Sequence, residues 1–227
     1  SLIAANNEIG AINPIAAIGE LCRRRGAIFH CDATQAIGRT LIRPTEMNVD
    51  LMSASAHKIY GPKSVGILIA GAGPNRVRLR GTIIGGGQQR GIRGGTMNPA
   101  SVVAMAAAIG EMLGTDPAAT LTKIESNNRH DGALRDQLWR RLSAGIDGLQ
   151  INGPSLGSDA RLANNLNLML PAIEGEAWIS AAREVAFSSG SACSSTDPAP
   201  SHVLTAIGLN ESEARRSVRF GVGRGNT

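Results

Sequence analysis

The chain has 227 residues, 42% of them hydrophobic, with a formal net charge of +5, which allows one large or two small domains with a buried core. With 3% aromatic residues, no apolar run of the roughly 18 residues that a membrane span needs and no signal-peptide pattern, we expect a cytoplasmic protein that binds neither nucleic acid nor membranes. The three irregularly spaced cysteines, Cys22, Cys31 and Cys193, exclude a disulfide framework and fit a reducing cytosol.

The first half of the chain alternates short apolar runs with a helical pattern, in the order SLIAAN, PIAAIGELCRRRG, AIFHCD, VDLMSAS and VGILIA. Pro14 and Gly26 bracket a helix whose apolar face contains Ile15, Ile18 and either Leu21 or Cys22. This alternation is typical of βαβ units, so we predict an α/β fold with a mainly parallel sheet.

Residues 71 to 98 are rich in glycine, arginine and polar residues, including the run GGGQQRGIRGGTMN. Such a composition predicts a functional loop in which the backbone approaches another group closely.

Two long helices are expected next, the first at SVVAMAAAIGEML and the second from about residue 119 to 143. The second has an apolar stripe of Leu121, Ile124, Leu134, Leu138 and Leu142. We place a domain boundary near residues 114 to 117, which predicts domains at 1–114 and 115–227.

The remaining residues predict a smaller α+β domain. Strands are expected at LANNLNLML, VAFSSG and SVRFGV, and helices at about 174–183 and 200–207.

A group of polar residues follows the apolar run VDLM in the segment SASAHKIYGPK. Ser55, His57 and Lys58 should lie at the carboxyl edge of the sheet, where open α/β folds form binding crevices. A lysine whose pKa is lowered by burial and by a neighbouring cation can form a Schiff base, and Ser55 and His57 can donate to a phosphate. The alternative is a polar strand exit with a solvated lysine.

The segment HCDATQ ends another apolar run. A buried Asp32 needs a cationic partner such as a pyridinium nitrogen, with Gln35 nearby, although it could simply cap a helix. We expect no metal here, because the side chains of the adjacent residues His30, Cys31 and Asp32 alternate between opposite faces of a strand.

Two residues near the end of the chain have reactive or binding chemistry. Cys193 lies in the small-residue run SSGSACSSTDPAPS, which suits an exposed, reactive thiol. Arg219, in the strand-like run SVRFGV, can clamp a carboxylate with two hydrogen bonds, unless it is only a solvated strand residue.

Six segments together resemble the group I cysteine desulfurases of the NifS and IscS type, which are fold-type I enzymes that use pyridoxal 5'-phosphate. They are ANNEIG at 5–10, HCDATQAIG at 30–38, SAHKIYGPK at 55–63, GGGQQRGIRGGT at 85–96, SSGSACSS at 188–195 and SVRFGVGR at 217–224. The resemblance spans the whole chain in the family's order. It implies part of a large cofactor-binding domain followed by a smaller α+β domain.

The resemblance also implies the roles of individual residues. Lys58 bonds the cofactor, Asp32 pairs with its pyridine nitrogen and Gln35 contacts its phenolic oxygen. The other implied contacts are Ser55 and His57 to the phosphate, Thr96 to the partner's phosphate across a dimer interface, and Asn7 and Arg219 to the substrate carboxylate.

The implied reaction takes sulfur from L-cysteine, leaving L-alanine and a persulfide on Cys193. Catalysis would then involve Lys58, His57 and Cys193, in a homodimer that passes sulfur to an acceptor protein such as an iron–sulfur scaffold. A selenocysteine lyase or another enzyme of the same fold is an alternative, although an aminotransferase has no need of Cys193.

The family's preceding portion, with a phosphate loop and a histidine stacked on the cofactor, has no counterpart here. The chain therefore resembles a C-terminal fragment, and an inactive remnant is the second alternative.

Overall fold

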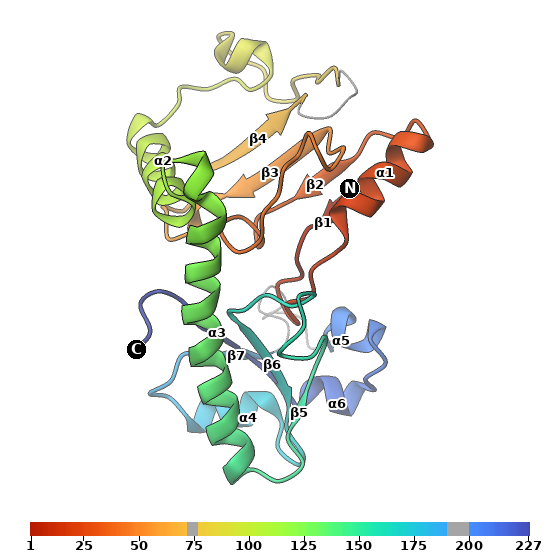
Figure 1. Ribbon diagram of the computed structural model, residues 1–227, viewed down its shortest axis with the longest axis vertical. Coiled ribbons are helices and arrows are strands. Elements are labelled where there is room, and N and C mark those ends of the chain that lie inside the picture. The colour runs from red at the N-terminus through yellow and green to blue at the C-terminus, as the bar shows by residue number, and fades with distance from the viewer. Residues whose placement is uncertain (72–76, 190–199) are drawn as a thin grey trace. The chain divides into compact units, whose positions relative to one another are not determined.

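The computed structural model describes residues 1–71, 77–189 and 200–227, which form two compact units (Figure 1). Unit 1 contains Ser1–Ala4 and Pro14–Ile124, and unit 2 contains Ala5–Asn13 and Glu125–Thr227. The chain therefore changes unit after Ala4, after Asn13 and again within helix α3 (Thr120–Gly145).

Unit 1 contains a four-stranded sheet in the order β1 (Leu2–Ile3), β2 (His30–Asp32), β3 (Leu51–Ser55) and β4 (Gly66–Ala70). Strands β1, β2 and β3 run parallel, and β4 pairs antiparallel with β3. The prediction of an α/β fold with a mainly parallel sheet is confirmed.

Helix α1 (Ile15–Arg24) begins directly after Pro14, whose fixed φ suits a helix start. Gly26 has a left-handed φ of 64° just beyond its end, as the sequence predicts. Ile15 and Gly19 are buried, and Leu21 is 47% exposed whereas Cys22 is half-buried. Of the two residues considered for the apolar face, Cys22 therefore lies on it.

Helix α2 (Pro99–Leu113) fixes the position of the turn that follows β3. Asn98 caps the helix by accepting a hydrogen bond from the backbone N–H of Ser101. Buried Ala108 and Met112 pack against Ile59, which directly follows the 3-10 turn η1 (Ala56–Lys58).

The loop at residues 77–98 is irregular except for the 3-10 turn η2 (Gln88–Gly91) and an isolated bridge between Ile83 and Arg93. Gly94 shows why glycine is needed there. A Cβ atom on Gly94 would lie 2.5 Å from the backbone nitrogen of Gly85. The close approach expected from the sequence is thus made, at least here, between two stretches of the loop itself.

Unit 2 contains an antiparallel sheet in the order β5 (Gln150–Ile151), β6 (Asn165–Met169), β8 (Ser217–Gly221) and β7 (Ser188–Ser189). Its shorter helices are α4 (Gly175–Ala181), α5 (His202–Ala206) and α6 (Glu211–Arg215). A 3-10 turn, η3 (Pro117–Ala119), precedes α3. The expected strands and helices are present, while β5 and α6 were not predicted.

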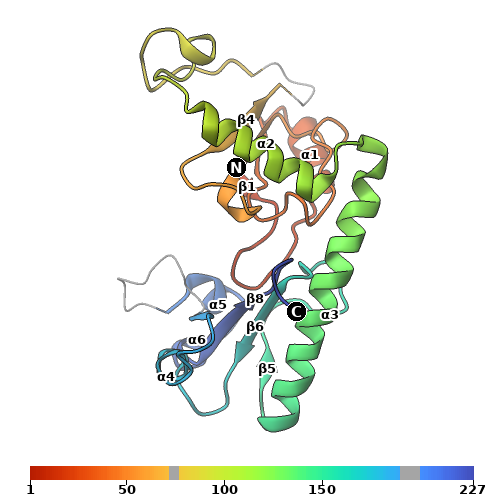
Figure 2. The same cartoon turned by 90° about the vertical axis from the view of Figure 1, so that its left-hand side faces the viewer.

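The core of unit 2 lies between this sheet and α3, which Figure 2 shows beside β5 and β6. Leu138 and Leu142 of α3 pack against a buried cluster that comprises Leu166, Leu168, Leu170, Val218 and Phe220. The ring of Phe220 also lies 4.8 Å from that of Phe187 and 5.7 Å from that of Trp178, centroid to centroid.

The predicted apolar stripe of α3 was wrong for one residue. Leu121 is 47% exposed. It belongs to unit 1, whereas Leu138 and Leu142 pack in the core of unit 2, so a single stripe does not extend along the whole helix. No helix within the described ranges is long and apolar enough to cross a membrane.

Candidate active site

Asp32 and Ser55 are the last residues of two neighbouring parallel strands, β2 and β3. Asp32 is half-buried, and its Oδ1 accepts a hydrogen bond of 2.9 Å from the backbone N–H of Thr34. Its Oδ2 has no hydrogen-bond partner within the described part of the chain. Asp32 therefore caps a turn rather than the helix that its alternative role required, and it still offers one carboxylate oxygen to a ligand.

Ser55 and His57 lie together at the same edge of the sheet. The Ser55 hydroxyl and Nδ1 of His57 are 3.1 Å apart, within hydrogen-bond distance. His57 is exposed and belongs to η1. A hydroxyl and an imidazole so placed form a pair of donors for a phosphate oxygen.

Lys58 has a fixed backbone, but its side chain is exposed and not buried as expected for a Schiff-base lysine. The next residue, Ile59, is fully buried. The backbone carbonyl of Lys58 accepts a hydrogen bond of 3.2 Å from Nη1 of Arg39. The Lys58 amine forms no ion pair with any residue that the structure describes. The amine is thus accessible at the end of a well-anchored turn.

Gln35 and Thr96 also belong to unit 1. Gln35 is half-buried in the turn that follows β2, and Thr96 is exposed just before α2. Neither side chain hydrogen-bonds to another predicted site residue in the described ranges.

Asn7 and Arg219 are brought together in unit 2. Nη1 of Arg219, on β8, donates a hydrogen bond of 2.8 Å to the backbone carbonyl of Asn7. Arg219 is half-buried and lies opposite Asn167 and Ser188 of the neighbouring strands. It is therefore a held side chain rather than a freely solvated strand arginine.

Sequence reasoning missed a buried polar cluster around Asn7. Glu8, Asn165, Asn167 and Ser201 are each less than 7% exposed. Burial raises the pKa of the Glu8 carboxyl, against opposing effects of the Ser201 hydrogen bond and of the charges of His202 and Arg219. The signal in the sequence was a glutamate within an otherwise uncharged segment, ANNEIG.

The three cysteines differ in their environment. Cys193 lies in residues 190–199, outside the described residues. Cys31 is fully buried, and burial, together with the negative charge of Asp32, raises the pKa of its thiol to about 11. Cys31 is thus an unreactive core residue.

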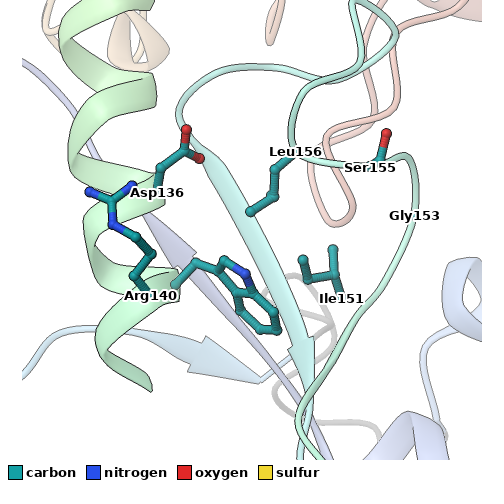
Figure 3. A pocket seen from close by; sticks show the side chains of 7 residues that line it. Asp136, Arg140, Ile151, Gly153, Ser155 and Leu156 are labelled. Atoms are coloured by element: carbon teal, nitrogen blue, oxygen red, sulfur yellow. The ribbon is translucent and has the colours of Figure 1, made fainter. Parts of the chain in front are cut away.

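A cavity of about 560 Å³ lies elsewhere in unit 2. Figure 3 shows Asp136 and Arg140 of α3 on one side of it and Ile151 and Leu156 on the other. None of the predicted site residues lines it. Within the described ranges, no three histidine, cysteine or acidic side chains cluster as a metal site would require.

The donor set in unit 1 fits pyridoxal 5'-phosphate chemically. An amine for the aldehyde, a carboxylate oxygen for the ring nitrogen and a hydroxyl–imidazole pair for the phosphate all lie at or just after the carboxyl ends of β2 and β3. The carboxyl ends of parallel strands are where such folds bind cofactors.

The fold and this site define a member of the class-V aminotransferase family. The family model matches residues 1–227, so the chain belongs to this family. Among curated relatives, the cysteine desulfurase IscS of Histophilus somni (strain 2336) is 44% identical over 227 residues, which are 100% of this chain and 53% of that protein. A probable mitochondrial cysteine desulfurase of Dictyostelium discoideum is 42% identical, over 100% of this chain and 48% of that protein.

A solved structure shows the same fold. The NifS-like protein from Rickettsia africae ESF-5 matches with a TM-score of 0.80 and 29% identity, over 100% of this chain and 57% of that one. The chain spans about half the length of the curated relatives it matches.

Proposed function

We propose that this chain provides the lysine and the sulfur-accepting cysteine of a pyridoxal-phosphate-dependent cysteine desulfurase. The observation that carries the proposal is that Asp32 and Ser55 end adjacent parallel strands, with His57 and Lys58 in the turn directly after Ser55. The IscS relatives that are 44% identical over the whole chain support the same activity.

Each side chain has a distinct role at the cofactor. Lys58 bonds it through the amine, Asp32 holds a proton on the ring nitrogen, and Gln35 donates to the phenolic oxygen. Ser55 and His57 bind the phosphate, and Thr96 binds the phosphate held by the second subunit of a homodimer. When bound, pyridoxal phosphate supplies an electron sink for charge that develops on the substrate.

The substrate is L-cysteine, whose carboxylate is bound by Arg219 and Asn7. The Lys58 amine, freed when the amino group of the substrate takes its place, would remove the proton from Cα as a general base. The Cys193 thiolate then attacks the substrate sulfur, so that the Cβ–S bond breaks and an S–S bond forms. L-cysteine and one thiol become L-alanine and one persulfide, and no outside oxidant is needed.

The persulfide on Cys193 requires a second protein that accepts the sulfur. We propose an iron–sulfur scaffold as this acceptor, on the basis of the IscS relatives, and the cytoplasm as the location. The Dictyostelium relative is described as mitochondrial, so cell fractionation tests the location.

The test compares Lys58→Ala with Lys63→Ala in the protein as its gene encodes it. Lys63 is an exposed lysine in the same segment, so its variant controls for the loss of a positive charge. We expect added pyridoxal phosphate to give a cofactor absorbance band with the wild type and Lys63→Ala, and none with Lys58→Ala. An unchanged band in Lys58→Ala would refute the cofactor assignment.

A second variant tests the sulfur acceptor. Cys193→Ser should keep the cofactor band and lose the persulfide detected by alkylation and mass spectrometry. A persulfide that persists would place the acceptor on another residue. Turnover of selenocysteine but not cysteine would favour a lyase instead.

A further inference from the structure

The carboxylate of Glu8 is buried in unit 2, at 5% exposure, and points to Ser201. Its Oε2 accepts a hydrogen bond from the Ser201 hydroxyl. The charged groups that face it are His202, on the neighbouring helix α5, and Arg219, on β8. Glu8 therefore links the segment ANNEIG to the start of α5.

The Ser201 hydroxyl is fully used by this arrangement. Its oxygen caps α5 by accepting from the backbone N–H groups of Val203, at 3.2 Å, and Leu204, at 3.3 Å. Its single proton is then left for Glu8, which accepts it. The bond between Glu8 and Ser201 thus adds to the helix cap and does not compete with it.

The backbone of Glu8 is fixed by the side chains of other residues and not by the Glu8 carboxylate. The Glu8 carbonyl accepts hydrogen bonds from the side-chain amides of Asn165, at 2.9 Å, and Asn167, at 3.1 Å. Its N–H donates to Oδ1 of Asn6 at 2.8 Å. The position of Asn7, next to it, is therefore kept without the carboxylate.

Helix α5 is also docked independently of Glu8. Ile9 packs in a buried cluster with Leu204 of α5 and Ala214 of α6. Removing the Glu8 carboxylate should leave unit 2 folded, because neither this packing nor the backbone bonds depend on it.

Folding stability does not explain a carboxylate at this position. Burial raises the pKa of Glu8, which means that the ionised form is disfavoured in the folded protein. A glutamine has the same shape and offers an oxygen to Ser201 without that cost.

The residues that are connected through Glu8 indicate a role for its carboxylate near Cys193. Ser201 lies just after the segment 190–199 that contains Cys193, and Ser188, just before that segment, pairs with Arg219 on β8. Arg219 in turn binds the carbonyl of Asn7, the neighbour of Glu8. Ser188 and Ser201, two described residues on either side of positions 190–199, are thus both connected to the same group of residues.

We propose that Glu8 is a positioning residue that fixes Ser201, the start of α5, relative to the Asn7–Arg219 pair and thereby speeds sulfur transfer to Cys193. This inference rests on the proposed function. Glu8 acts through Ser201 and touches neither the cofactor nor the sulfur.

The test uses the protein as its gene encodes it, with variants Glu8→Ala, Glu8→Gln and Ser201→Gly. Glycine keeps most of the capping preference of serine, so Ser201→Gly removes chiefly the bond to Glu8. We expect Glu8→Ala and Ser201→Gly to lower kcat about tenfold. The KM for cysteine should stay within about twofold, because the Asn7–Arg219 pair is kept.

Further variants separate positioning from general loosening of unit 2. Glu8→Gln keeps an acceptor for Ser201 and should retain kcat within about threefold. Asn210→Ala removes the cap of α6, a helix of the same length as α5, and should leave kcat unchanged. The double variant Glu8→Ala/Ser201→Gly should be no slower than either single variant, because both remove one interaction.

Direct detection locates the defect. In Glu8→Ala, cysteine should change the cofactor absorbance as in the wild type, while persulfide on Cys193, measured by alkylation and mass spectrometry, forms about tenfold more slowly. The proposal is overturned if Glu8→Ala or Ser201→Gly keeps the wild-type kcat, or if Asn210→Ala loses as much. A wild type that forms no persulfide from cysteine would instead overturn the proposed function itself.

Discussion

Arg161 is a buried cation held by neutral oxygen atoms, and replacing it provides a sharp test of the unit 2 structure. The side chain is 4% exposed. It donates to the carbonyls of Asn152, at 2.8 Å, of Pro154, and of Asn165, at 3.3 Å, and to Oδ1 of Asn165 at 3.1 Å. Burial, and then the nearby charge of Arg135, lowers the pKa of its guanidinium to about 10.

The expected effect of Arg161→Met is the difference between two opposing contributions. The substitution removes four charge-assisted hydrogen bonds, which at about 1.5 kcal/mol each amount to about 6 kcal/mol. It also removes a charge whose desolvation by burial disfavours the folded state, which offsets part of that sum. We therefore expect the free energy of unfolding to fall by about 3 kcal/mol, a large part of the stability of a typical domain.

The measurement is urea unfolding followed by circular dichroism, in the protein as its gene encodes it. Arg129→Met, at an exposed position on α3, is the matched control and should change the free energy of unfolding by less than about 0.5 kcal/mol. A loss of under about 1 kcal/mol in Arg161→Met would show that water or rearranged side chains satisfy the four acceptors.

Three further predictions follow from the local surroundings of Glu8, of two glycines and of Cys31. The pKa of Glu8 is raised from 4.5 in the folded protein. The stability contributed by its protonated form is therefore complete below pH 4.5 and is lost as the pH rises through the raised value. Thermal unfolding from pH 4 to 8 should show this loss relative to Glu8→Gln, and parallel curves for the two proteins would contradict it. Gly61→Ala should destabilise by about 1–3 kcal/mol, because the new Cβ would lie 2.9 Å from that of Ala56. Gly110→Ala, within α2, should instead stabilise by about 1 kcal/mol, and chemical unfolding that gave both variants the same sign would refute this contrast. With the pKa of its thiol raised to about 11, Cys31 should resist iodoacetamide at pH 8 until urea unfolds the chain, and labelling of the native protein, detected by mass spectrometry, would contradict its burial.

Much of the fold is local in origin and was therefore predictable. Helix α1 is marked by Pro14 and Gly26, and α2 and α3 by their length and apolar residues. Strand β5 has only two residues, too few to show an alternating pattern. Helix α6 was overlooked although Asn210 and Glu213 form a capping box, which is a recognisable start signal.

The site was predictable only in part, because its parts depend on contacts between distant positions. Ser55, His57 and Lys58 lie within one short segment, so a strand followed by a turn already places them together. Glu8, in contrast, acquires its environment from Asn165, Asn167 and Ser201, more than 150 positions away. No periodicity in the segment ANNEIG signals such partners.

The division of the chain into units has a consequence for the order of folding. Residues 5–13 belong to unit 2, although the rest of that unit follows residue 124. During synthesis, the carbonyl and carboxylate of Glu8 remain solvated until their hydrogen-bond partners Asn167 and Ser201 have been synthesised. Contacts at such long sequence separation slow folding, so unit 2 should complete its structure last, and pulse-labelling hydrogen exchange should protect the amides of β2 and β3 before those of β6 and β8.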